Sequence, residues 1–299
     1  MAVLALDVGG TKLAAALVDE AGTILRQARV GTPADPWPAC LDLLQQVQGD
    51  AGVEGVGAGC GGPMAWPAGR VSPLNMASWQ DFPLRERLRE RWPGVPVRVH
   101  NDAVCAAAGE HWLGVGRGVD DLLGMVVSTG VGGGLVLGGR LHDGPSGNAG
   151  HIGHVVVEPD GPRCGCGGRG CLEAVARGPA VVAWAAERGC TAHDGRELAE
   201  LAGAGDAVAR AALARAGTAV GRAAASVAAL LDLRLVVVGG GLSLSGAALW
   251  GPLEQAFHDQ ARLGFLTGAA VVPAFLGADT GLLGAAALVL QGDRYWSAA

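Results

Sequence analysis

Short apolar runs alternate with turns over the N-terminal part of the chain. Residues 3–6 and 13–18 are apolar, and a turn that contains two glycines separates them. A second turn at residues 19–22 leads into a third run that begins at Thr23. Strand, tight turn, strand, turn and strand is the pattern of an antiparallel meander.

A similar pattern appears about 120 residues later. Residues 122–127 are apolar, residues 128–134 form a glycine-rich turn, and residues 135–137 are apolar again before Gly138-Gly139. We interpret the two patterns as two domains of related topology, although glycine-rich hairpins also resemble one another through composition alone.

Strands and helices alternate along the rest of the chain. The expected elements are strands over residues 53–60, 95–99 and 235–238, and helices over residues 82–92, 103–112 and 206–231. Such alternation after an opening meander is typical of mixed α/β layers.

Composition narrows the class of protein. Half of the 299 residues are hydrophobic and 17% are charged, which is typical of a folded protein with room for two domains. The net charge of −6 and the lack of Lys or Arg runs argue against binding nucleic acid or a membrane. The first apolar run stops at Asp7, too early for a signal peptide, and the run at 281–290 is about half a membrane span. We therefore expect a cytoplasmic protein.

The first glycine turn carries groups that suit a nucleotide. Asp7 ends the first strand, and Lys12, the only lysine of the chain, follows the turn. Two glycines let backbone N–H groups approach a phosphate, and a carboxylate at a strand end can hold Mg²⁺. An ordinary hairpin turn is the alternative for this stretch. Neither a P-loop nor a Rossmann glycine pattern occurs.

Two more glycine-rich turns follow later strands. They are Ser128-Thr129-Gly130 and Gly239-Gly240-Gly241. Each alone reads as a hairpin, but three such strand ends together favour a phosphate and nucleotide cleft.

Polar residues also end a predicted buried strand at His100, Asn101 and Asp102. The carboxyl ends of strands are where α/β proteins carry reactive groups. Asp102 precedes an alanine-rich helix, so a helix N-cap is the alternative role. A carboxylate in this position can still act as a general base.

Three of the seven cysteines, Cys164, Cys166 and Cys171, lie within eight residues. His154 precedes them and gives the pattern H-x9-C-x-C-x4-C. Three thiolates and one imidazole complete a tetrahedral zinc site of the structural kind. Reduced cysteines in a loop are the alternative.

Zinc would order a loop that has little apolar content of its own. It would also fix His151 and Glu173, which flank the ligands. Ordered polar groups beside a phosphate cleft suggest a polyhydroxylated substrate.

Together these motifs resemble the ROK family (repressors, open reading frames and sugar kinases), which has the actin-like, hexokinase-like fold. The matched stretches are LALDVGGTK (4–12), NDAVCAAAGE (101–110), STGVGGG (128–134), AGHIGH (149–154), CGCGGRGCLE (164–173) and VVVGGG (236–241). The resemblance implies an α/β, two-domain actin-like ATPase (ribonuclease H-like) fold with a cleft between the domains and a zinc-bound loop. The smaller domain would cover residues 1–115, with a C-terminal helix at about 281–299 packing back on it. The larger domain would cover residues 116–280 and carry the zinc loop.

The family also implies an ATP-dependent kinase for the 6-hydroxyl of a hexose or N-acetyl hexosamine, with Mg²⁺ bound alongside ATP and a structural Zn²⁺. Asp102 would be the general base. The sugar would be held by Gly62, Asn101, Asp102, His151, His154 and Glu173. The phosphates and nucleotide would be held by Asp7, Gly9, Gly10, Thr11, Lys12, Thr129, Gly130, Gly240 and Gly241. The zinc ligands would be His154, Cys164, Cys166 and Cys171. A homodimer or homotetramer is expected.

His151 departs from the family pattern, because glucokinase-like members have glutamate at this position. A neutral imidazole accepts only one hydrogen bond, so the identity of the sugar stays open. A loop histidine that points elsewhere is the alternative for His151.

Two other functions also stay open. One is a non-catalytic sugar-binding protein, and the other is a sugar-responsive repressor. The meander starts at residue 3, which leaves no room before it for a DNA-binding helix-turn-helix.

Overall fold

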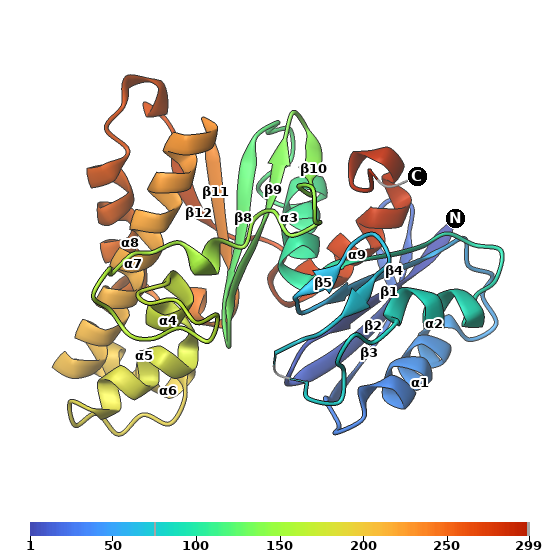
Figure 1. Ribbon diagram of the computed structural model, residues 1–299, viewed down its shortest axis with the longest axis horizontal. Helices are drawn as coiled ribbons and strands as arrows, with labels where there is room; N and C mark the ends of the chain where they lie inside the picture. Colours follow the sequence, from blue (N-terminus) through green and yellow to red (C-terminus); the bar gives the residue numbers. More distant parts are fainter. Residues whose placement is uncertain (75, 298–299) are drawn as a thin grey trace. The chain divides into compact units, whose positions relative to one another are not determined.

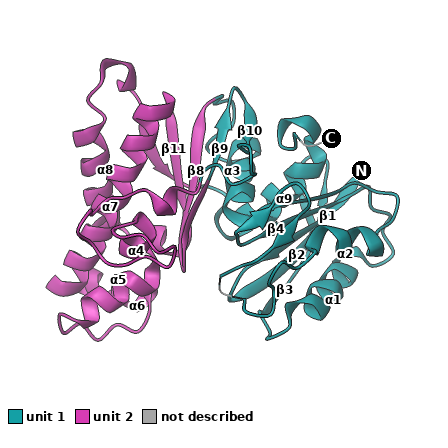
Figure 2. Ribbon diagram, viewed as in Figure 1, with its two compact units in different colours: residues 1–120, 134–150, 275–299 teal, residues 121–133, 151–274 magenta. Residues whose placement is uncertain are grey.

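The chain forms two structural units, which Figure 2 shows in different colours. The computed structural model describes residues 1–74 and 76–297. Unit 1 comprises residues 1–120, 134–150 and 275–299, and unit 2 comprises residues 121–133 and 151–274. The domain boundaries expected from the sequence, near residues 115 and 280, stay a prediction.

The predicted N-terminal meander opens the sheet of unit 1. The strands are β1 (Ala2–Val8), β2 (Lys12–Asp19), β3 (Ile24–Gly31), β4 (Val56–Cys60) and β7 (Val97–Asn101). The first three pair antiparallel, and β4 and then β7 continue the sheet in parallel, in the order β3-β2-β1-β4-β7. The short strands β5 (Met64–Ala65) and β6 (Arg70–Val71) form a separate hairpin.

A second five-stranded sheet repeats this topology. Its strands are β8 (Leu122–Val127), β9 (Val131–Leu137), β10 (Arg140–His142), β11 (Leu235–Gly239) and β12 (Ala270–Pro273). Their order is β10-β9-β8-β11-β12, and β8, β11 and β12 run parallel. The two sheets thus share one strand order, which confirms the related topology predicted from the two glycine-rich patterns.

The described residues of unit 1 form the helices α1 (Pro36–Gln48), α2 (Leu84–Arg91), α3 (Asp102–Trp112) and α9 (Thr280–Leu290). Helix α9 packs against α3 and against strands β1 and β4 (Figure 1). Glycine makes the close approach possible, because a Cβ on Gly284 would lie 1.6 Å from the Cys105 carbonyl oxygen. The helix expected over 281–299 ends at Leu290, and residues 298–299 lie outside the described part of the chain.

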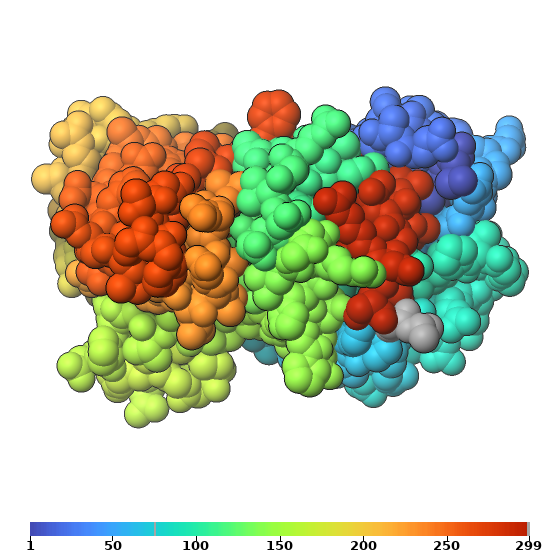
Figure 3. All heavy atoms as spheres, turned by 90° about the horizontal axis from the view of Figure 1, so that it is seen from above, coloured from blue at the N-terminus to red at the C-terminus, as the bar shows by residue number. Residues whose placement is uncertain are grey.

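After α9 the chain makes a 3-10 turn, η5 (Gly292–Arg294), and returns to the surface of β9 and β10. The Arg140 guanidinium donates to the Asp293 carbonyl at 2.8 Å, and Arg294 Nε donates to the Gly139 carbonyl at 3.0 Å. Figure 3 shows this red C-terminal segment beside the green strands. Tyr295 and Trp296 of this segment are buried.

Unit 2 carries the helices α4 (Leu172–Ala176), α5 (Gly178–Ala186), α6 (Gly195–Ala204), α7 (Ala207–Leu231) and α8 (Ala247–Gln260). It also carries the 3-10 turns η1 (Ile152–His154), η2 (Gly241–Leu244) and η3 (Gly264–Leu266), while η4 (Gly277–Asp279) precedes α9. The alanine-rich helix α7 packs tightly on α8. A Cβ on Gly217 or Gly221 would lie 2.2 Å from a carbonyl oxygen of α8, so these two positions require glycine.

Among the described residues, no helix is both long and apolar enough to cross a bilayer.

Candidate functional site

In unit 1, three parallel strands end at one edge of the sheet. The strand register pairs Val8 of β1 with Cys60 of β4, and Cys60 with Asn101 of β7. The residues that follow these strands therefore lie side by side, at the edge where α/β proteins bind ligands. Asp7, the last residue but one of β1, and Asp102, the first residue of α3, lie at this edge.

The turn after β1 is held by its own backbone. The Gly9 N–H donates to the Lys12 carbonyl at 3.0 Å, and the Thr32 hydroxyl donates to the Gly9 carbonyl at 2.7 Å. A Cβ on Gly9 would approach the Lys12 carbonyl oxygen to 3.0 Å. Thr11 and Lys12 are exposed on this turn, so a phosphate can reach both of them.

The alternative role considered for Asp102, the N-cap of α3, is wrong, because Asp102 is the first residue of that helix. Asn101 is the N-cap of α3, and its side-chain oxygen accepts from the Ala103 N–H at 3.0 Å. Asp102 Oδ1 accepts from the same N–H at 2.8 Å. Asn101 is buried, while Asp102 is partly exposed. A residue with capping contacts can still use its other carboxylate oxygen as a base.

The turn after β4 lies next to Asp102. A Cβ on Gly61 would be 4.0 Å from Asp102 Oδ2, and a Cβ on Gly59 would be 3.4 Å from the Asp102 Cα. Gly62 follows in the same turn. Glycine at position 61 therefore puts no side chain next to the Asp102 carboxylate.

The two carboxylates of this edge influence each other. Burial raises the pKa of Asp7 to about 6, and the negative charge of Asp102 adds to the increase. Lys12 and Arg29 act in the opposite direction on this pKa. Ionising both carboxylates therefore costs free energy in the ligand-free protein, and a bound cation would offset that cost.

In unit 2, the glycine-rich turns that follow the parallel strands β8 and β11 lie next to each other. The parallel register pairs Val126 of β8 with Gly239 of β11. A Cβ on Gly241 would lie 3.6 Å from the Ser128 hydroxyl oxygen, and one on Gly240 would lie 2.4 Å from the Val127 carbonyl. The turn at Ser128 and the turn at Gly240 are thus adjacent, as the nucleotide prediction requires.

Glu173 joins the zinc-loop segment to the first of these turns. Its Oε2 accepts from the Val131 N–H at 3.0 Å, and a Cβ on Gly130 would lie 3.2 Å from the same oxygen. Gly153 of η1 packs beside them, since a Cβ there would be 2.1 Å from the Val131 carbonyl oxygen. The carboxylate of Glu173 is therefore fixed close to Gly130 and Val131.

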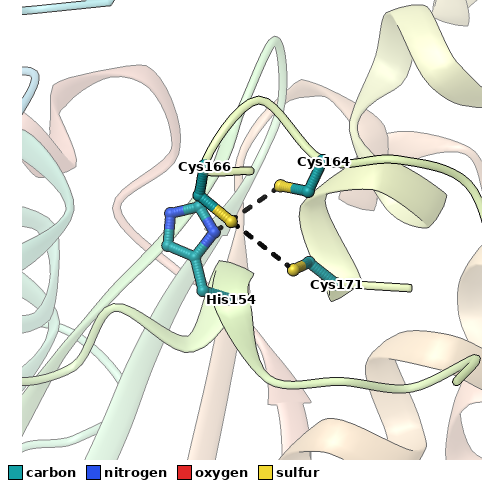
Figure 4. A group of neighbouring side chains, drawn as sticks. All are labelled: His154, Cys164, Cys166 and Cys171. Carbon is teal, nitrogen blue, oxygen red and sulfur yellow. Dashed lines mark hydrogen bonds between the residues drawn. The ribbon is translucent and has the colours of Figure 1, made fainter. Parts of the chain in front are cut away.

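The four predicted zinc ligands come together in unit 2 (Figure 4). Their ligand atoms all lie within 4.8 Å of one another. Cys164 Sγ is 3.7 Å from His154 Nδ1, and Cys166 Sγ is 3.8 Å from Cys171 Sγ. A tetrahedron with Zn–S of about 2.3 Å and Zn–N of about 2.0 Å has edges of about 3.5–3.8 Å. The donor set and its spacing fit one zinc ion.

His154 faces the sulfurs through Nδ1, so Nε2 lies on the opposite side of the ring. The His151 and His154 rings lie nearly parallel, with centroids 6.4 Å apart. The structure thus brings His151 next to a zinc ligand, at the start of η1.

The zinc loop is also tied to α7. Arg215 donates to both carboxylate oxygens of Glu158, at 2.9 and 2.6 Å. A Cβ on Gly170 would lie only 1.6 Å from the Glu158 carbonyl oxygen, and Gly170 has φ +69°. Only glycine fits at this position of the loop.

A cavity of about 840 Å³ opens beside η2 in unit 2. Leu244 and Ser245 line it, together with Arg196 of α6 and Arg210 of α7. The Leu244 side chain is 84% exposed. An exposed apolar side chain at a cavity beside the Gly240 turn offers a surface on which a planar base can lie.

The predicted site residues fall into two groups, and each group is assembled within one unit. Unit 1 brings together Asp7, Gly9, Gly10, Thr11, Lys12, Gly62, Asn101 and Asp102. Unit 2 brings together Thr129, Gly130, His151, His154, Cys164, Cys166, Cys171, Glu173, Gly240 and Gly241.

Sequence reasoning missed some residues that the fold places at these sites. Gly281 is one, because a Cβ there would lie 3.0 Å from Asp7 Oδ2. The Arg215–Glu158 pair is another. The spacing of Gly281 and Gly284 along one apolar segment was a signal for close helix packing, whereas nothing local pairs Arg215 with Glu158.

Comparison with known proteins points to one family. The sequence model of the family described as "ROK family" matches residues 3–292. A glucokinase of Thermotoga maritima is 34% identical over 310 residues, covering 97% of both chains. An N-acetylmannosamine kinase of Shigella flexneri is 37% identical over 302 residues, covering 98% of this chain and 100% of its own.

Solved structures agree with these relatives. A ROK family glucokinase from Streptomyces griseus in complex with glucose and AMPPNP matches with a TM-score of 0.85 and 35% identity, covering 98% of this chain and 100% of its own. A ROK hexokinase from Thermus thermophilus matches with a TM-score of 0.85 and 39% identity, covering 97% of this chain and 98% of its own.

The zinc assignment makes a prediction about metal content. The purified protein should contain one zinc per chain, and Cys166→Ser should lose most of it because a serine hydroxyl is a poor zinc ligand. Amide hydrogen exchange over residues 155–173 should then become faster. Cys190→Ser, which removes a thiol outside the cluster, is the control and should keep its zinc. Full zinc content in Cys166→Ser would contradict the assignment.

The raised pKa of Asp7 predicts a pH-dependent stability. Between pH 3.8 and about 6 the folded protein holds this proton more tightly than the unfolded chain, so ionisation at higher pH destabilises the fold. Asp7→Asn should raise the free energy of unfolding of the ligand-free protein by about 1–2 kcal/mol at pH 7, after a discount for partial exposure. The gain should disappear near pH 4.

Denaturant unfolding at the two pH values measures this effect, with Asp50→Asn at an exposed position as the control for net charge. An Asp7→Asn protein less stable than wild type at pH 7 would show that Asp7 stabilises the fold.

Proposed function

Because the chain belongs to the ROK family, we propose that it is an ATP-dependent sugar kinase acting on the 6-hydroxyl of a hexose or N-acetyl hexosamine. The observation that carries this proposal is the pair of neighbouring carboxylates at the carboxyl edge of the sheet in unit 1, Asp7 and Asp102. The Asp7 carboxylate suits a metal–triphosphate, and the Asp102 carboxylate suits an alcohol.

Asp102 is the proposed general base. The sugar 6-oxygen forms a bond to the γ-phosphorus, the bond from that phosphorus to the bridging oxygen breaks, and ADP leaves. The proton of the hydroxyl passes to Asp102 and then to solvent. The glycine turn beside Asp102 supports this role, because a Cβ on Gly61 would lie 4.0 Å from Asp102 Oδ2 and glycine puts no side chain there.

The phosphates are assigned to the glycine turns. Asp7 supplies a carboxylate for Mg²⁺ or its water, and the elevated pKa of Asp7 supports a site prepared for a cation. When bound, Mg²⁺ would neutralise charge on the transferring phosphoryl group. Backbone amides of the turns at residues 10–11 and 129–130 are suited to phosphate oxygens, and the cavity lined by Leu244 and Ser245 is suited to adenosine.

The sugar hydroxyls are assigned to Asn101 in unit 1 and to His154 and Glu173 in unit 2. The zinc ion would hold His154 through Nδ1, which leaves Nε2 for a hydroxyl. Glu173 is already oriented by the Val131 N–H, so its second oxygen can accept from the sugar. Ordering of these groups before binding would lower the entropy cost of holding a flexible hydroxylated ligand.

The remaining expectations concern partners and location. We infer that the chain acts as a homodimer or homotetramer in the cytoplasm, without nucleic acid or membrane partners. The net charge of −6 supports the lack of a nucleic-acid partner.

The base assignment predicts a specific loss of turnover. Asp102→Asn should keep the fold, since the amide oxygen can still accept from the Ala103 N–H, but kcat should fall by about 10²–10⁴. ADP release with ATP, Mg²⁺ and sugar measures kcat, and the thermal transition checks folding. Near wild-type turnover in Asp102→Asn would refute the assignment. Absence of ADP release with every sugar, even for wild type, would favour a non-catalytic binding protein.

The acceptor is tested by a panel of glucose, mannose, fructose, allose and N-acetyl hexosamines including N-acetylmannosamine. His151 lies next to the zinc ligand His154, so it should help to set the preference. His151→Glu should shift kcat/KM toward glucose by about tenfold, because a carboxylate accepts more hydroxyl hydrogen bonds than an imidazole. An unchanged order of preference would exclude His151 from specificity.

A further inference from the structure

A chain of hydrogen bonds in unit 1 runs from the exposed Ser297 through the buried side chains of Asp143 and His100 to the backbone N–H of Asn101. The Ser297 hydroxyl donates to Asp143 Oδ2 at 2.7 Å, and His100 Nε2 lies 2.9 Å from Asp143 Oδ1. The Asn101 backbone N–H donates to His100 Nδ1 at 2.8 Å. His100 is 1% exposed and Asp143 is 7% exposed. Neither residue has a role in the proposed reaction.

The bond from Asn101 defines the protonation of His100. Since Nδ1 accepts the Asn101 N–H, the ring proton is on Nε2, where it can donate to the Asp143 carboxylate. A buried carboxylate needs such partners, and Asp143 has two donors, His100 and Ser297. Asp143 therefore selects the tautomer in which His100 can hold the Asn101 peptide.

The fold explains why this peptide needs an acceptor. Strand β7 is an edge strand of its sheet, so peptide groups on its outer side have no neighbouring strand to bond. Nδ1 of His100 takes the place of a strand carbonyl for the Asn101 N–H. Asn101 is both the end of β7 and the N-cap of α3, and the next residue is Asp102.

Asp143, at the other side of His100, is also held by several contacts. Asp143 begins the segment after β10, where its carbonyl accepts from the Ala149 N–H at 3.0 Å. Trp66 packs against both His100 and Trp296, the residue before Ser297. The C-terminal segment thus helps to keep Asp143 in place.

We propose that His100, oriented by Asp143, is a positioning residue that holds the Asn101 peptide and thereby aims Asp102 and the Asn101 amide at the sugar. This inference rests on the proposed function of Asp102 as the base. Its physical reason is the sensitivity of proton transfer to geometry, since a displacement of about 1 Å can cost about 10²-fold in rate.

Two substitutions of His100 separate positioning from stability, because each keeps a different half of the ring. The amide oxygen of His100→Asn lies near the position of Nδ1, so this variant keeps the acceptor for Asn101 and loses the donor to Asp143. The longer His100→Gln keeps a donor near Nε2 for Asp143 and loses the acceptor for Asn101.

The proposal predicts that His100→Gln loses more activity than His100→Asn, whereas His100→Asn loses more stability than His100→Gln. His100→Gln should lose about 10- to 100-fold in kcat while its melting temperature stays near wild type and KM for ATP changes less than about twofold. His100→Asn should keep kcat within about threefold but melt at a lower temperature, because Asp143 loses a buried donor. Hydrogen exchange of the Asn101 amide should be faster in His100→Gln than in His100→Asn.

Asp143→Asn is the second variant, in case His100→Asn does not fold. Its amide oxygen can still accept from His100 Nε2–H, so kcat should stay within about threefold of wild type, in contrast to His100→Gln. Wild-type kcat in His100→Gln, or losses of kcat that simply follow the losses of melting temperature, would overturn the proposal.

Asp102→Asn in the same assay distinguishes this failure from a failure of the proposed function. If Asp102→Asn loses turnover while His100→Gln keeps it, the base assignment stands and only the positioning role is wrong. If Asp102→Asn keeps turnover, the base assignment falls, and the positioning role that rests on it falls as well.

Discussion

The parallel register of β1, β4 and β7 is the constraint on which the site in unit 1 depends. It pairs Val8 with Cys60 and Cys60 with Asn101, and so it brings Asp7 and Asp102 to the same edge of one sheet. Two partly buried carboxylates close together are unfavourable in the absence of a ligand, as the elevated pKa of Asp7 indicates. In the proposed function this arrangement is useful, because Asp7 would hold Mg²⁺, which would neutralise its charge, and Asp102 would accept the proton of the sugar hydroxyl.

The loop at Cys164 has too few apolar side chains to form an ordered core of its own. Zinc held by His154 and the three cysteines would replace the missing core, while the Arg215–Glu158 pair and the close contact at Gly170 define how the loop lies on unit 2. The Val131 N–H already orients Glu173, and zinc would orient His154 in the same way before any ligand binds. In the proposed function, a structural metal would therefore serve recognition and would take no part in the bond-making step.

Much of the fold could be predicted from local patterns, and the failures have physical causes. The β1 turn, the β7–α3 junction and the zinc ligands depend on residues close in sequence, and these predictions match the structure. The sequence analysis made no prediction for helix α1, which begins with Pro36 and has Pro38 in its first turn, where proline is tolerated. The pairing of His100 with Asp143 spans 43 residues, and its partner Ser297 lies near the other end of the chain. Such contacts follow only from the tertiary fold.

The central claim is that Asp102 takes the proton of a sugar hydroxyl. A crystal structure with a phosphorylatable hexose, Mg²⁺ and a non-hydrolysable ATP analogue tests it most directly. The account predicts the 6-hydroxyl within hydrogen-bond distance of Asp102, about 2.6–3.2 Å, with the γ-phosphate on the far side of that oxygen. A sugar whose 6-hydroxyl faces another side chain, with Asp102 turned to solvent, would contradict the account.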